Sequence, residues 1–227
     1  KIIPKKFRYF SDMWNMNSHF LFSFAEYYDP YNQSFWKLRV FNDDYLQWNS
    51  WFEFHPHKHY EILTLMLDWT ITHKDNLWNI EKISRNEIQV TDTASWIMHS
   101  EVNEEDKDLS LYQIWFSPDE TSTKPIYYKS KYQDKDLENN LYQIASWIDE
   151  NAINKLTSKV EILRWIFNEN KEIKVNFKDY VFIYVTNWEI EVNWKKAWEK
   201  DQIRIFWEEN IDIKFLKKSD IVVIYSK

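Results

Sequence analysis

The feature that most constrains this chain is the absence of glycine from all 227 residues, combined with 14 tryptophans. Glycine normally makes up roughly 7% of a protein. Tryptophan follows Asp68, Asn187 and Asn193, where Asp-Gly and Asn-Gly are the usual signals of a β-hairpin turn. Such turns need a positive φ angle, which costs a residue with a side chain about 1–2 kcal/mol. About a dozen such costs would equal the whole stability of a domain, which is about 5–15 kcal/mol.

We therefore hypothesise that most of these tryptophans are glycines in the living organism. A UGA codon that is reassigned to glycine, but translated with a table that reads it as Trp, would produce this pattern. The abundance of Ile, Lys and Asn is typical of an AT-rich genome, in which UGA could displace the GC-rich glycine codons. The alternative is a Trp-rich surface or sugar-binding protein, but the tryptophans follow turns rather than strand faces. Peptide mass spectrometry of the native protein tests the hypothesis, which predicts glycine at positions 69 and 188.

Composition argues against several classes of protein. The chain is 44% hydrophobic, which is enough for the core of one large domain or two small ones. Its net charge of -7 gives no reason to expect nucleic acid or an anionic membrane as a partner, because both need a basic face. Without cysteine, it has no disulfide, no thiolate metal site and no cysteine nucleophile.

The chain also lacks the sequence signals of membrane insertion and export. No apolar run approaches the ~20 residues of a membrane span. No signal peptide is visible, and the first residue is Lys1 rather than Met, so we expect a few residues to precede it. These observations predict a cytoplasmic protein.

Short apolar runs separated by turn residues follow one another at even spacing. Predicted strands lie at 60–67, 69–74, 79–83, 87–92, 96–101 and 109–116. Others follow at 141–146, 160–165, 172–176, 180–186, 189–192, 202–206, 211–216 and 220–225. Residues 126–140 are charged and favour a short helix or a linker, whereas residues 1–20 give only a weak signal. Evenly spaced short strands indicate an antiparallel sandwich or barrel.

Two polar clusters lie in or beside these strands. They are His55-Pro56-His57 and His99-Ser100-Glu101. Residues i and i+2 of a strand point to the same face, so His55 and His57 can point together, as can His99 and Glu101. Two such strands side by side would bring three imidazoles and one carboxylate to one point, and a metal there would keep positions for water or substrate. The alternative is a surface strand with incidental histidines.

Other polar and apolar residues lie near these clusters in the sequence. His59 shares the strand parity of His55 and His57, but we place it past the metal on the barrel wall. His73 lies in a predicted turn and is expected to be solvated or hydrogen-bonded. Asn42, Asp43 and Asp44 can either hydrogen-bond the ligand histidines or cap a turn. Some apolar residues could line a cavity above the metal or belong to the ordinary core: Phe41, Phe52, Phe54, Met66 and Met98.

Several segments of the chain match the pattern of a known family. They are Phe22-Ser23-Phe24-Ala25, Tyr28-Asp29-Pro30, Leu38-Arg39-Val40, Asn42-Asp43-Asp44, His55-Pro56-His57, His73-Lys74-Asp75, His99-Ser100-Glu101 and Leu111-Tyr112-Gln113-Ile114-Trp115. With these segments the chain resembles the pirin family of two-domain cupins, most densely over residues 22–133.

The family pattern also bears on the tryptophans. It has glycine where this chain has Trp14, Trp36, Trp51, Trp69, Trp78 and Trp96, and Trp188 and Trp194 fit in the same way. Trp115, by contrast, looks like a true tryptophan. The full side chain of Trp96, three residues before His99, would threaten the metal pocket.

The resemblance implies an all-β bicupin, which has two antiparallel β-barrels of the jelly-roll or double-stranded β-helix type and few short helices. It implies an N-terminal metal-binding cupin domain at residues 1–128 and a C-terminal cupin domain at residues 129–227. All six histidines lie at or before His99, so the second domain cannot build a histidine metal site.

The resemblance further implies that His55, His57, His99 and Glu101 bind one divalent metal, commonly iron. We therefore expect Fe(II), although these ligand types also allow Mn, Ni, Cu, Co or Zn. Some bacterial members look like quercetin 2,3-dioxygenases. In such an enzyme the metal would bind the hydroxyl and carbonyl oxygens of a flavonol, and Glu101 would take the hydroxyl proton as general base. Dioxygen would then open the ring with loss of carbon monoxide.

Family membership does not choose between this activity and two other functions. The partners of the enzyme would be a small aromatic substrate and dioxygen. The main alternative is a non-catalytic, redox-responsive binding or regulatory protein, whose metal alters a surface that a protein partner reads. A third possibility is an isomerase or another cupin enzyme that uses the same ligands on a different substrate.

Overall fold

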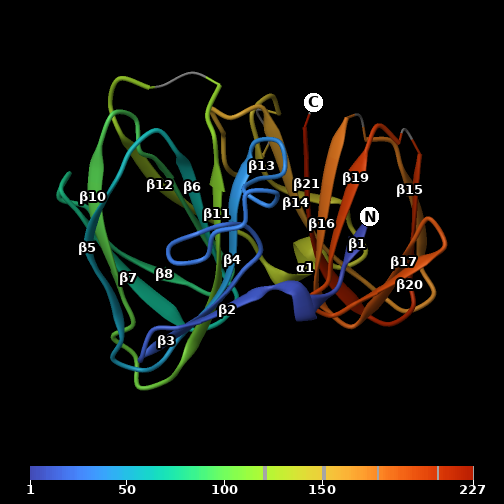
Figure 1. The fold of residues 1–227 in the computed structure, drawn as a ribbon, viewed down its shortest axis with the longest axis horizontal. Coiled ribbons are helices and arrows are strands. Elements are labelled where there is room, and N and C mark those ends of the chain that lie inside the picture. Colours follow the sequence, from blue (N-terminus) through green and yellow to red (C-terminus); the bar gives the residue numbers. More distant parts are fainter. Residues whose placement is uncertain (120–121, 150–151, 178, 209, 227) are drawn as a thin grey trace. The chain divides into compact units, whose positions relative to one another are not determined.

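The computed structural model describes residues 1–119, 122–149, 152–177, 179–208 and 210–226, and it consists almost entirely of β-strands (Figure 1). The chain divides into two compact units. The metal-site unit is Arg8–Lys131, and the second unit combines Lys1–Phe7 with Tyr132–Lys227. The domain division expected after residue 128 therefore falls inside strand β12 (Ile126–Lys131). Strand β1 (Ile2–Ile3), expected in the first domain, pairs with β19 (Gln202–Phe206) of the second unit.

The metal-site unit consists of two antiparallel sheets. The larger sheet has the strand order β12-β9-β6-β11-β4-β3-β2, and the smaller sheet has the order β5-β10-β7-β8. The strands are β2 (Tyr9–Asp12), β3 (Met16–Phe20), β4 (Leu38–Leu46), β5 (Trp51–His57), β6 (Glu61–Met66), β7 (Thr70–Asp75), β8 (Ile80–Ser84), β9 (Glu87–Asp92), β10 (Ile97–Val102) and β11 (Leu109–Phe116).

Alternation along the strands directs apolar side chains into the interior of this unit. In β10 the side chains of Ile97, His99 and Glu101 are buried and those between them are half-buried. One buried core cluster comprises Met16, Leu46, Met66, Ile71, Ile83, Leu109 and Leu111, which come from both sheets. Burying one such side chain contributes about 1.5–3 kcal/mol, so this core fixes the strands that carry the polar clusters.

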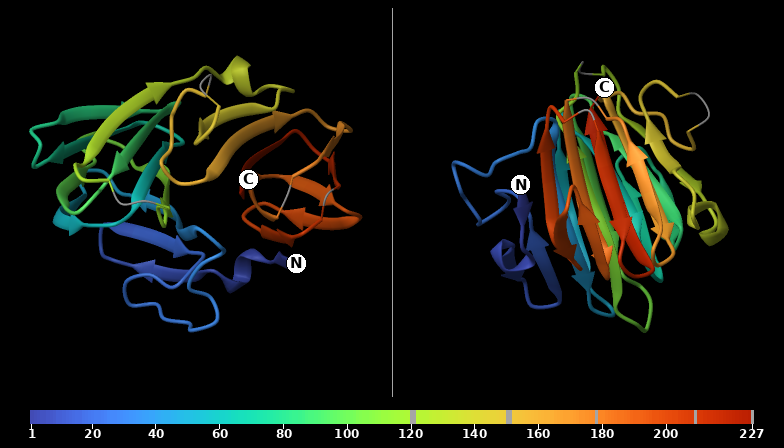
Figure 2. Two further views of the ribbon diagram at one scale, coloured as in Figure 1. Left: turned by 90° about the horizontal axis from the view of Figure 1, so that it is seen from above. Right: turned by 90° about the vertical axis from the view of Figure 1, so that its right-hand side faces the viewer.

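The second unit also consists of two sheets, in the orders β1-β19-β16-β21-β14-β13 and β15-β20-β17-β18. The orange and red strands of the larger sheet run side by side in Figure 2, right. Arg164 and Asp220 form a buried ion pair at 2.7 Å inside this unit. Its remaining elements are η1 (Lys5–Phe7), α1 (Asp134–Leu137), β13 (Tyr142–Ser146), β14 (Val160–Phe167), β15 (Glu172–Val175), β16 (Tyr180–Asn187), β17 (Glu189–Val192), β18 (Lys195–Trp198), β20 (Ile211–Phe215) and β21 (Ser219–Ser226).

The expected all-β, antiparallel architecture is confirmed, but some strands were missed. The segment expected to be a helix or linker begins with β12, whose residues pair with β9, and the short helix α1 follows it. β18 was also missed. Both strands lie at sheet edges and carry lysines, which is typical of edge strands and hides the apolar alternation. Among the described residues, no helix is long and apolar enough to span a membrane.

Many tryptophans occupy backbone positions that favour glycine. Those with φ between 46° and 71° are Trp14, Trp36, Trp69, Trp78, Trp188, Trp194 and Trp207. A Cβ atom is strained in this left-handed region, whereas glycine is not. Trp194 lies in the tight turn between the paired strands β17 and β18, where the sequence predicted a hairpin. Trp69 and Trp188 lie in turns that join strands of different sheets, β6 to β7 and β16 to β17, so the hairpins expected there do not form. These angles support the hypothesis that the tryptophans stand for glycine, which stays a proposal.

The remaining tryptophans differ among themselves. Trp165 is completely buried in the core of the second unit, as expected for a true tryptophan. Trp115 packs its ring edge-on against His57, at 4.6 Å between ring centroids. Trp51 and Trp96 are not among the described residues with positive φ, although the family pattern has glycine at both. The backbone therefore supports the glycine hypothesis at some of the matched positions and is neutral at others.

Candidate metal centre

The two polar clusters lie on neighbouring strands of the smaller sheet. β5 and β10 pair antiparallel, and the register places His55 directly opposite His99. On its other edge β10 pairs with β7, which places Glu101 opposite His73. His99 and Glu101 are both buried and face inward, as the i, i+2 spacing predicts. The structure thus brings together the clusters that the sequence singled out.

A β-bulge in β5 shapes the edge of the site. Between the pairs His99–His55 and Glu101–Phe52, β5 uses one more residue than β10. The extra residue changes the parity of the strand, so Phe52, His55 and His57 all lie on the less exposed face. Strict alternation would have turned Phe52 away from His55. The bulge therefore adds an aromatic side chain to the same side as the histidines.

The side chains of His55, His57 and His99 converge and fit a metal ion. Their ligand nitrogens lie within 4.8 Å of one another. The Nε2 atoms of His57 and His99 are buried and accept or donate no hydrogen bond among the described residues. His55 Nδ1 lies 2.6 Å from the carbonyl oxygen of Glu53, so Nδ1 carries the proton and Nε2 keeps its lone pair. Three imidazoles with free nitrogens at one point suit a divalent transition metal.

Burial keeps the two inner histidines neutral. It lowers the pKa of His57 to about 3, and the neighbouring His55 adds to the effect. Burial also lowers the pKa of His99 well below its usual value, with smaller contributions from His55, His57 and His73. A neutral imidazole offers a lone pair that an imidazolium lacks, so both residues are competent metal ligands at neutral pH.

Glu101 comes from the smaller sheet but is held by side chains of the larger one. Its Oε1 atom accepts hydrogen bonds from Gln89 Nε2 at 3.1 Å and from Thr64 Oγ1 at 3.3 Å. Its Oε2 atom accepts one from Gln113 Nε2 at 2.6 Å. Burial raises the pKa of Glu101 to about 7, although these hydrogen bonds act in the opposite direction. A carboxyl group that titrates near neutral pH suits general acid–base chemistry.

The donors to Glu101 belong to a polar row that crosses the larger sheet. Gln113 of β11 pairs with Asn42 of β4 on one side and with Thr64 of β6 on the other, and Thr64 pairs with Gln89 of β9. The sequence pointed to Asn42 but not to a role for Thr64, Gln89 or Gln113. β6 and β11 are otherwise rich in apolar residues, and a polar residue at a buried position needs a partner. That requirement is the signal that could have revealed the row.

His73 lies beside the candidate ligands and not in the expected turn. It is completely buried in strand β7 rather than exposed in a turn. The expected hydrogen bond does exist, since His73 Nε2 lies 3.0 Å from Asp75 Oδ2. His73 Nδ1 lies 3.5 Å from His99 Nδ1, so His99 directs its Nε2 atom toward the other histidines.

Asp75 is itself anchored, because it accepts hydrogen bonds from the backbone nitrogens of Leu77 and Asn79. His73, His99 and Glu101 also form a second group whose ligand atoms lie within 4.8 Å of one another. Glu101 is therefore linked to the three-histidine group through His99, which both groups share.

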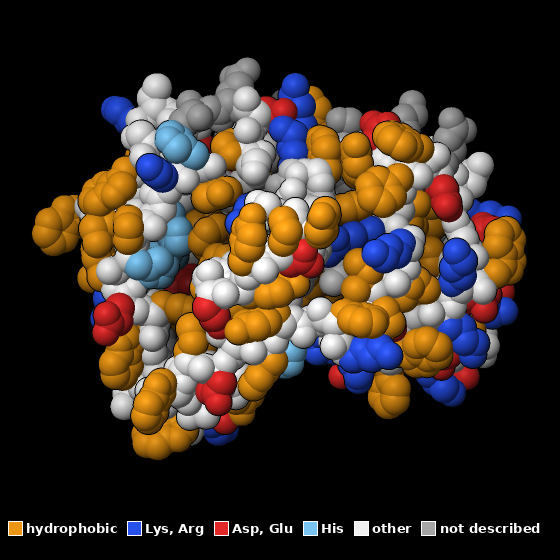
Figure 3. Space-filling model, viewed as in Figure 1, with side chains coloured by type: hydrophobic (Ala, Val, Ile, Leu, Met, Phe, Trp, Pro, Cys, Tyr) orange, Lys and Arg blue, Asp and Glu red, His pale blue; other side chains and the backbone are white. Residues whose placement is uncertain are grey.

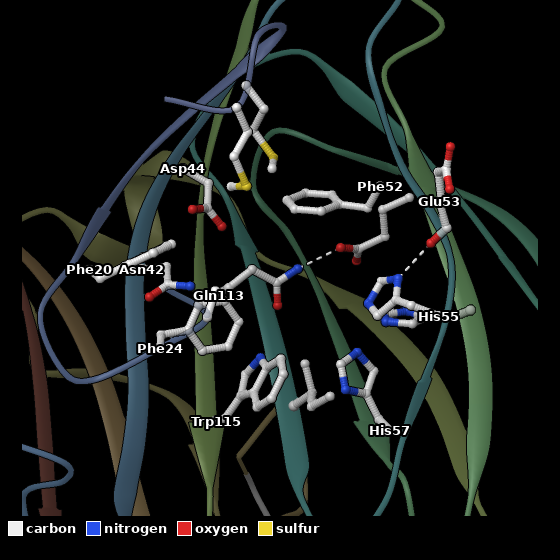
Figure 4. Close-up of a pocket in the computed structure, with 16 residues that line it drawn as sticks. Phe20, Phe24, Asn42, Asp44, Phe52, Glu53, His55, His57, Gln113 and Trp115 are labelled. Carbon is white, nitrogen blue, oxygen red and sulfur yellow. Dashed lines mark hydrogen bonds between the residues drawn. The ribbon is translucent and has the colours of Figure 1, made fainter. Parts of the chain in front are cut away.

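The three histidines and Glu101 line a pocket of about 300 Å³. In Figure 4, His55 and His57 lie on one side of this pocket, and Asn42 and Asp44 lie on the other. Much of the remaining lining is apolar and comes from Met13, Met16, Phe20, Phe24, Phe52, Ile62 and Trp115. Figure 3 shows histidine side chains at the surface beside hydrophobic ones. A small, largely apolar molecule could therefore reach the histidines.

The apolar lining differs from the expected one. Of the candidates from the sequence, Phe52 lines the pocket. Phe41 and Met66 are completely buried in the core, and Phe54 is 48% exposed. Met98 is not among the lining residues. Strict alternation from His55 already turns Phe54 outward, and only the bulge returns Phe52 to the face of the histidines.

Other residues near the clusters also lie elsewhere than expected. β5 ends at His57, and His59 is exposed with a φ of 59°, so the strand parity does not extend to it. Asp43 forms an ion pair with Arg8 at 2.9 Å, and Asp44 accepts a hydrogen bond from Ser18. Trp96 is 47% exposed and does not line the pocket, so its side chain does not threaten the site.

Facing β-sheets that enclose a cluster of histidines and a carboxyl group define a cupin-type fold with a candidate metal site. The family model described as Pirin matches residues 5–116. The quercetin 2,3-dioxygenase of Escherichia coli strain K12 is 32% identical over 211 residues, which cover 92% of this chain and 90% of the relative. A pirin-like protein of Caulobacter vibrioides is 37% identical over 131 residues, which cover 58% of this chain and 56% of that protein.

The similarity extends to solved structures. The crystal structure of the bacterial pirin YhhW from Escherichia coli in complex with nickel(II) matches with a TM-score of 0.94 and 29% identity. The match covers 100% of this chain and 98% of that chain. The chain therefore belongs to the pirin family, and its two units form the bicupin fold that the sequence indicated.

Proposed function

We propose that this protein is a metal-dependent dioxygenase that acts on flavonol-type substrates such as quercetin. One observation carries the proposal: three imidazoles with free Nε2 atoms and a buried carboxyl group line the same, mostly apolar pocket. The pocket volume of about 300 Å³ lies at the lower end of the range for small-molecule sites. The name of the Escherichia coli relative, quercetin 2,3-dioxygenase, supports the same substrate class.

We further propose that His55, His57, His99 and Glu101 hold the metal, and that the metal is Fe(II) rather than Mn, Ni, Cu, Co or Zn. The metal would supply Lewis acidity and redox chemistry to the bound substrate and dioxygen. The histidines contribute neutral nitrogen ligands, because burial suppresses the protonation of His57 and His99. The metal-binding domain would be the unit Arg8–Lys131, since all of these residues belong to it.

In this proposal Glu101 is the catalytic base. Its carboxylate would take the proton of the flavonol hydroxyl that lies next to the ring carbonyl. A pKa of about 7 in the metal-free protein lets this group change its protonation state near neutral pH. Gln89 and Gln113 would orient the carboxylate and stabilise its charge through their hydrogen bonds.

The apolar lining would position the substrate. Phe20, Phe24 and Phe52 offer aromatic surfaces on which a flat, aromatic molecule can pack. These side chains would also exclude water from the reacting ring.

Oxygen uptake by the Fe(II)-loaded protein with quercetin tests the proposal. The protein should carry glycine at the tryptophans that the family pattern matches. We expect uptake that depends on metal and is lost in His57→Ala. Glu101→Gln, which keeps the side-chain shape but cannot accept a proton, should slow turnover by about 10²–10⁴-fold.

Metal binding without oxygen uptake would contradict the enzymatic proposal. That result would favour the non-catalytic alternative, a metal-containing, redox-responsive binding or regulatory protein.

A further inference from the structure

Several buried polar atoms of the pocket are not used by the proposed metal site. Asn42 Oδ1, Gln113 Oε1 and Trp115 Nε1 are buried and form no hydrogen bond with any described residue. All three residues line the pocket. Asn42 is 4% exposed and Gln113 is 7% exposed. Buried polar atoms without partners are rare in proteins, so these atoms point to a ligand that completes their hydrogen bonds.

The orientation of these groups follows from their neighbours. Gln113 directs its Nε2 atom to Glu101, because this nitrogen donates a hydrogen bond to Glu101 Oε2 at 2.6 Å. Its Oε1 atom is therefore left as an acceptor. In Figure 4 the indole nitrogen of Trp115 points to the side of the pocket where Gln113 lies, and Asn42 lies across the pocket from His55. Two acceptors and one donor thus surround the same part of the pocket.

We propose that Asn42, Gln113 and Trp115 form a recognition site for a hydroxyl group of the substrate that does not bind the metal. A hydroxyl group is both a donor and an acceptor, so it can donate to an amide oxygen and accept from the indole N–H. An ether or carbonyl oxygen cannot donate, and an ammonium group cannot accept. The inference rests on the proposed flavonol-binding function and narrows it to flavonols with hydroxyl groups beyond the metal-binding one.

The nearby acidic side chain of Asp44 has one hydrogen-bond partner. Asp44 lies two residues after Asn42 on β4 and also lines the pocket, but it accepts a hydrogen bond from Ser18. Phe20 and Phe24 lie on the same side of the pocket as Asn42 in Figure 4 and would pack against the ring that carries the hydroxyl group. The hydroxyl site therefore lies beside aromatic side chains, where a hydrogen-bonding group discriminates strongly between ligands.

Anaerobic binding of two flavonols tests this site without turnover. Quercetin carries several hydroxyl groups, whereas 3-hydroxyflavone carries only the one beside the carbonyl. With the Zn(II)-loaded full chain, titration calorimetry should show quercetin binding at least about tenfold more tightly than 3-hydroxyflavone. Asn42→Val and Trp115→Phe should each reduce this ratio about fivefold to tenfold, and Trp115→Phe keeps an aromatic ring beside His57. The control Phe52→Leu should weaken both ligands equally and leave the ratio unchanged.

The outcomes separate this inference from the proposed function. If the wild-type protein binds both flavonols equally well, the hydroxyl site is refuted while the flavonol pocket stands. The same conclusion follows if Asn42→Val and Trp115→Phe weaken both ligands to the same extent. If neither flavonol binds the Zn(II)-loaded protein, the substrate class of the proposed function is refuted as well.

Discussion

Replacing Trp14, Trp78 and Trp194 with glycine should stabilise the protein. Their φ angles are 62°, 71° and 60°, and their side chains are 93%, 92% and 82% exposed, so the change removes little packing. A Cβ atom in this region costs about 1–2 kcal/mol. Glycine offsets about 0.5–1 kcal/mol of this gain in stability, because it increases the backbone entropy of the unfolded chain. The net gain is then about 0.5–1 kcal/mol per site.

The triple variant should gain about 1.5–3 kcal/mol if the effects of the three sites add. For a protein of this size, that gain corresponds to a rise of about 3–12 °C in Tm. Far-UV circular dichroism should follow the unfolding, because the substitutions themselves change tryptophan fluorescence. The substitutions at Trp14 and Trp78 change the metal-site unit, and the substitution at Trp194 changes the second unit.

Two control variants make the test specific. Trp78→Ala removes the exposed ring but keeps the Cβ atom, so it should give almost none of the gain. Trp165→Gly removes a completely buried ring at a residue without positive φ and should cost about 3–5 kcal/mol. If alanine and glycine stabilise the protein equally at Trp78, the gain does not come from backbone strain. The structural argument that these tryptophans stand for glycine would then fail.

Other predictions concern the pocket. Asp75→Asn should weaken metal binding about 10–100-fold, because Asp75 orients His73 and through it His99. An unchanged metal affinity in a competitive chelator titration would refute this orienting role of Asp75. A metal ion at 100 times its Kd should raise the unfolding free energy by about 2.7 kcal/mol in the wild type, and chelation should remove the gain. When the unfolding free energy is measured by urea titration, His99→Ala should show no such gain on adding the metal. Burial raises the pKa of Asp44 from 3.8 to about 8. Because the folded-state pKa is the higher one, the wild type should lose stability as the pH rises from about 4 to about 8. Asp44→Asn should therefore be more stable than the wild type at alkaline pH by about 1–3 kcal/mol. If urea unfolding gives the two proteins the same dependence of stability on pH, burial does not raise the pKa of Asp44.

The ligand candidates could be predicted because strand periodicity is local. His55 and His57 are two residues apart, as are His99 and Glu101, and a period of two places each pair on one face whatever surrounds the strand. The positive φ angles of Trp69 and Trp188 were predictable for the same reason, although the turns that contain them join strands of different sheets and are not hairpins. Each of these features depends on a few neighbouring residues and not on the rest of the fold.

Features that depend on distant parts of the chain could not be predicted in this way. The bulge in β5 is defined by its pairing with β10, and it turns Phe52 toward the pocket, where strict alternation would turn it away. His73 reads as a turn residue from its charged neighbours, yet β7 lies between β8 and β10 and buries it. β12 is charged because it lies at a sheet edge, and that position is not encoded by its own residues.

Glu101 shows most clearly why the chemistry of the site is less predictable than its ligands. The residue type and spacing identify it as an oxygen donor next to His99. Its acid–base behaviour, however, depends on three strands of the opposite sheet, because Thr64, Gln89 and Gln113 hold its carboxylate while burial raises its pKa. His99 is oriented separately by His73 on β7. Glu101 and His99 therefore share one strand but are held by different sheets, so their relative position depends on how the two sheets of this unit pack.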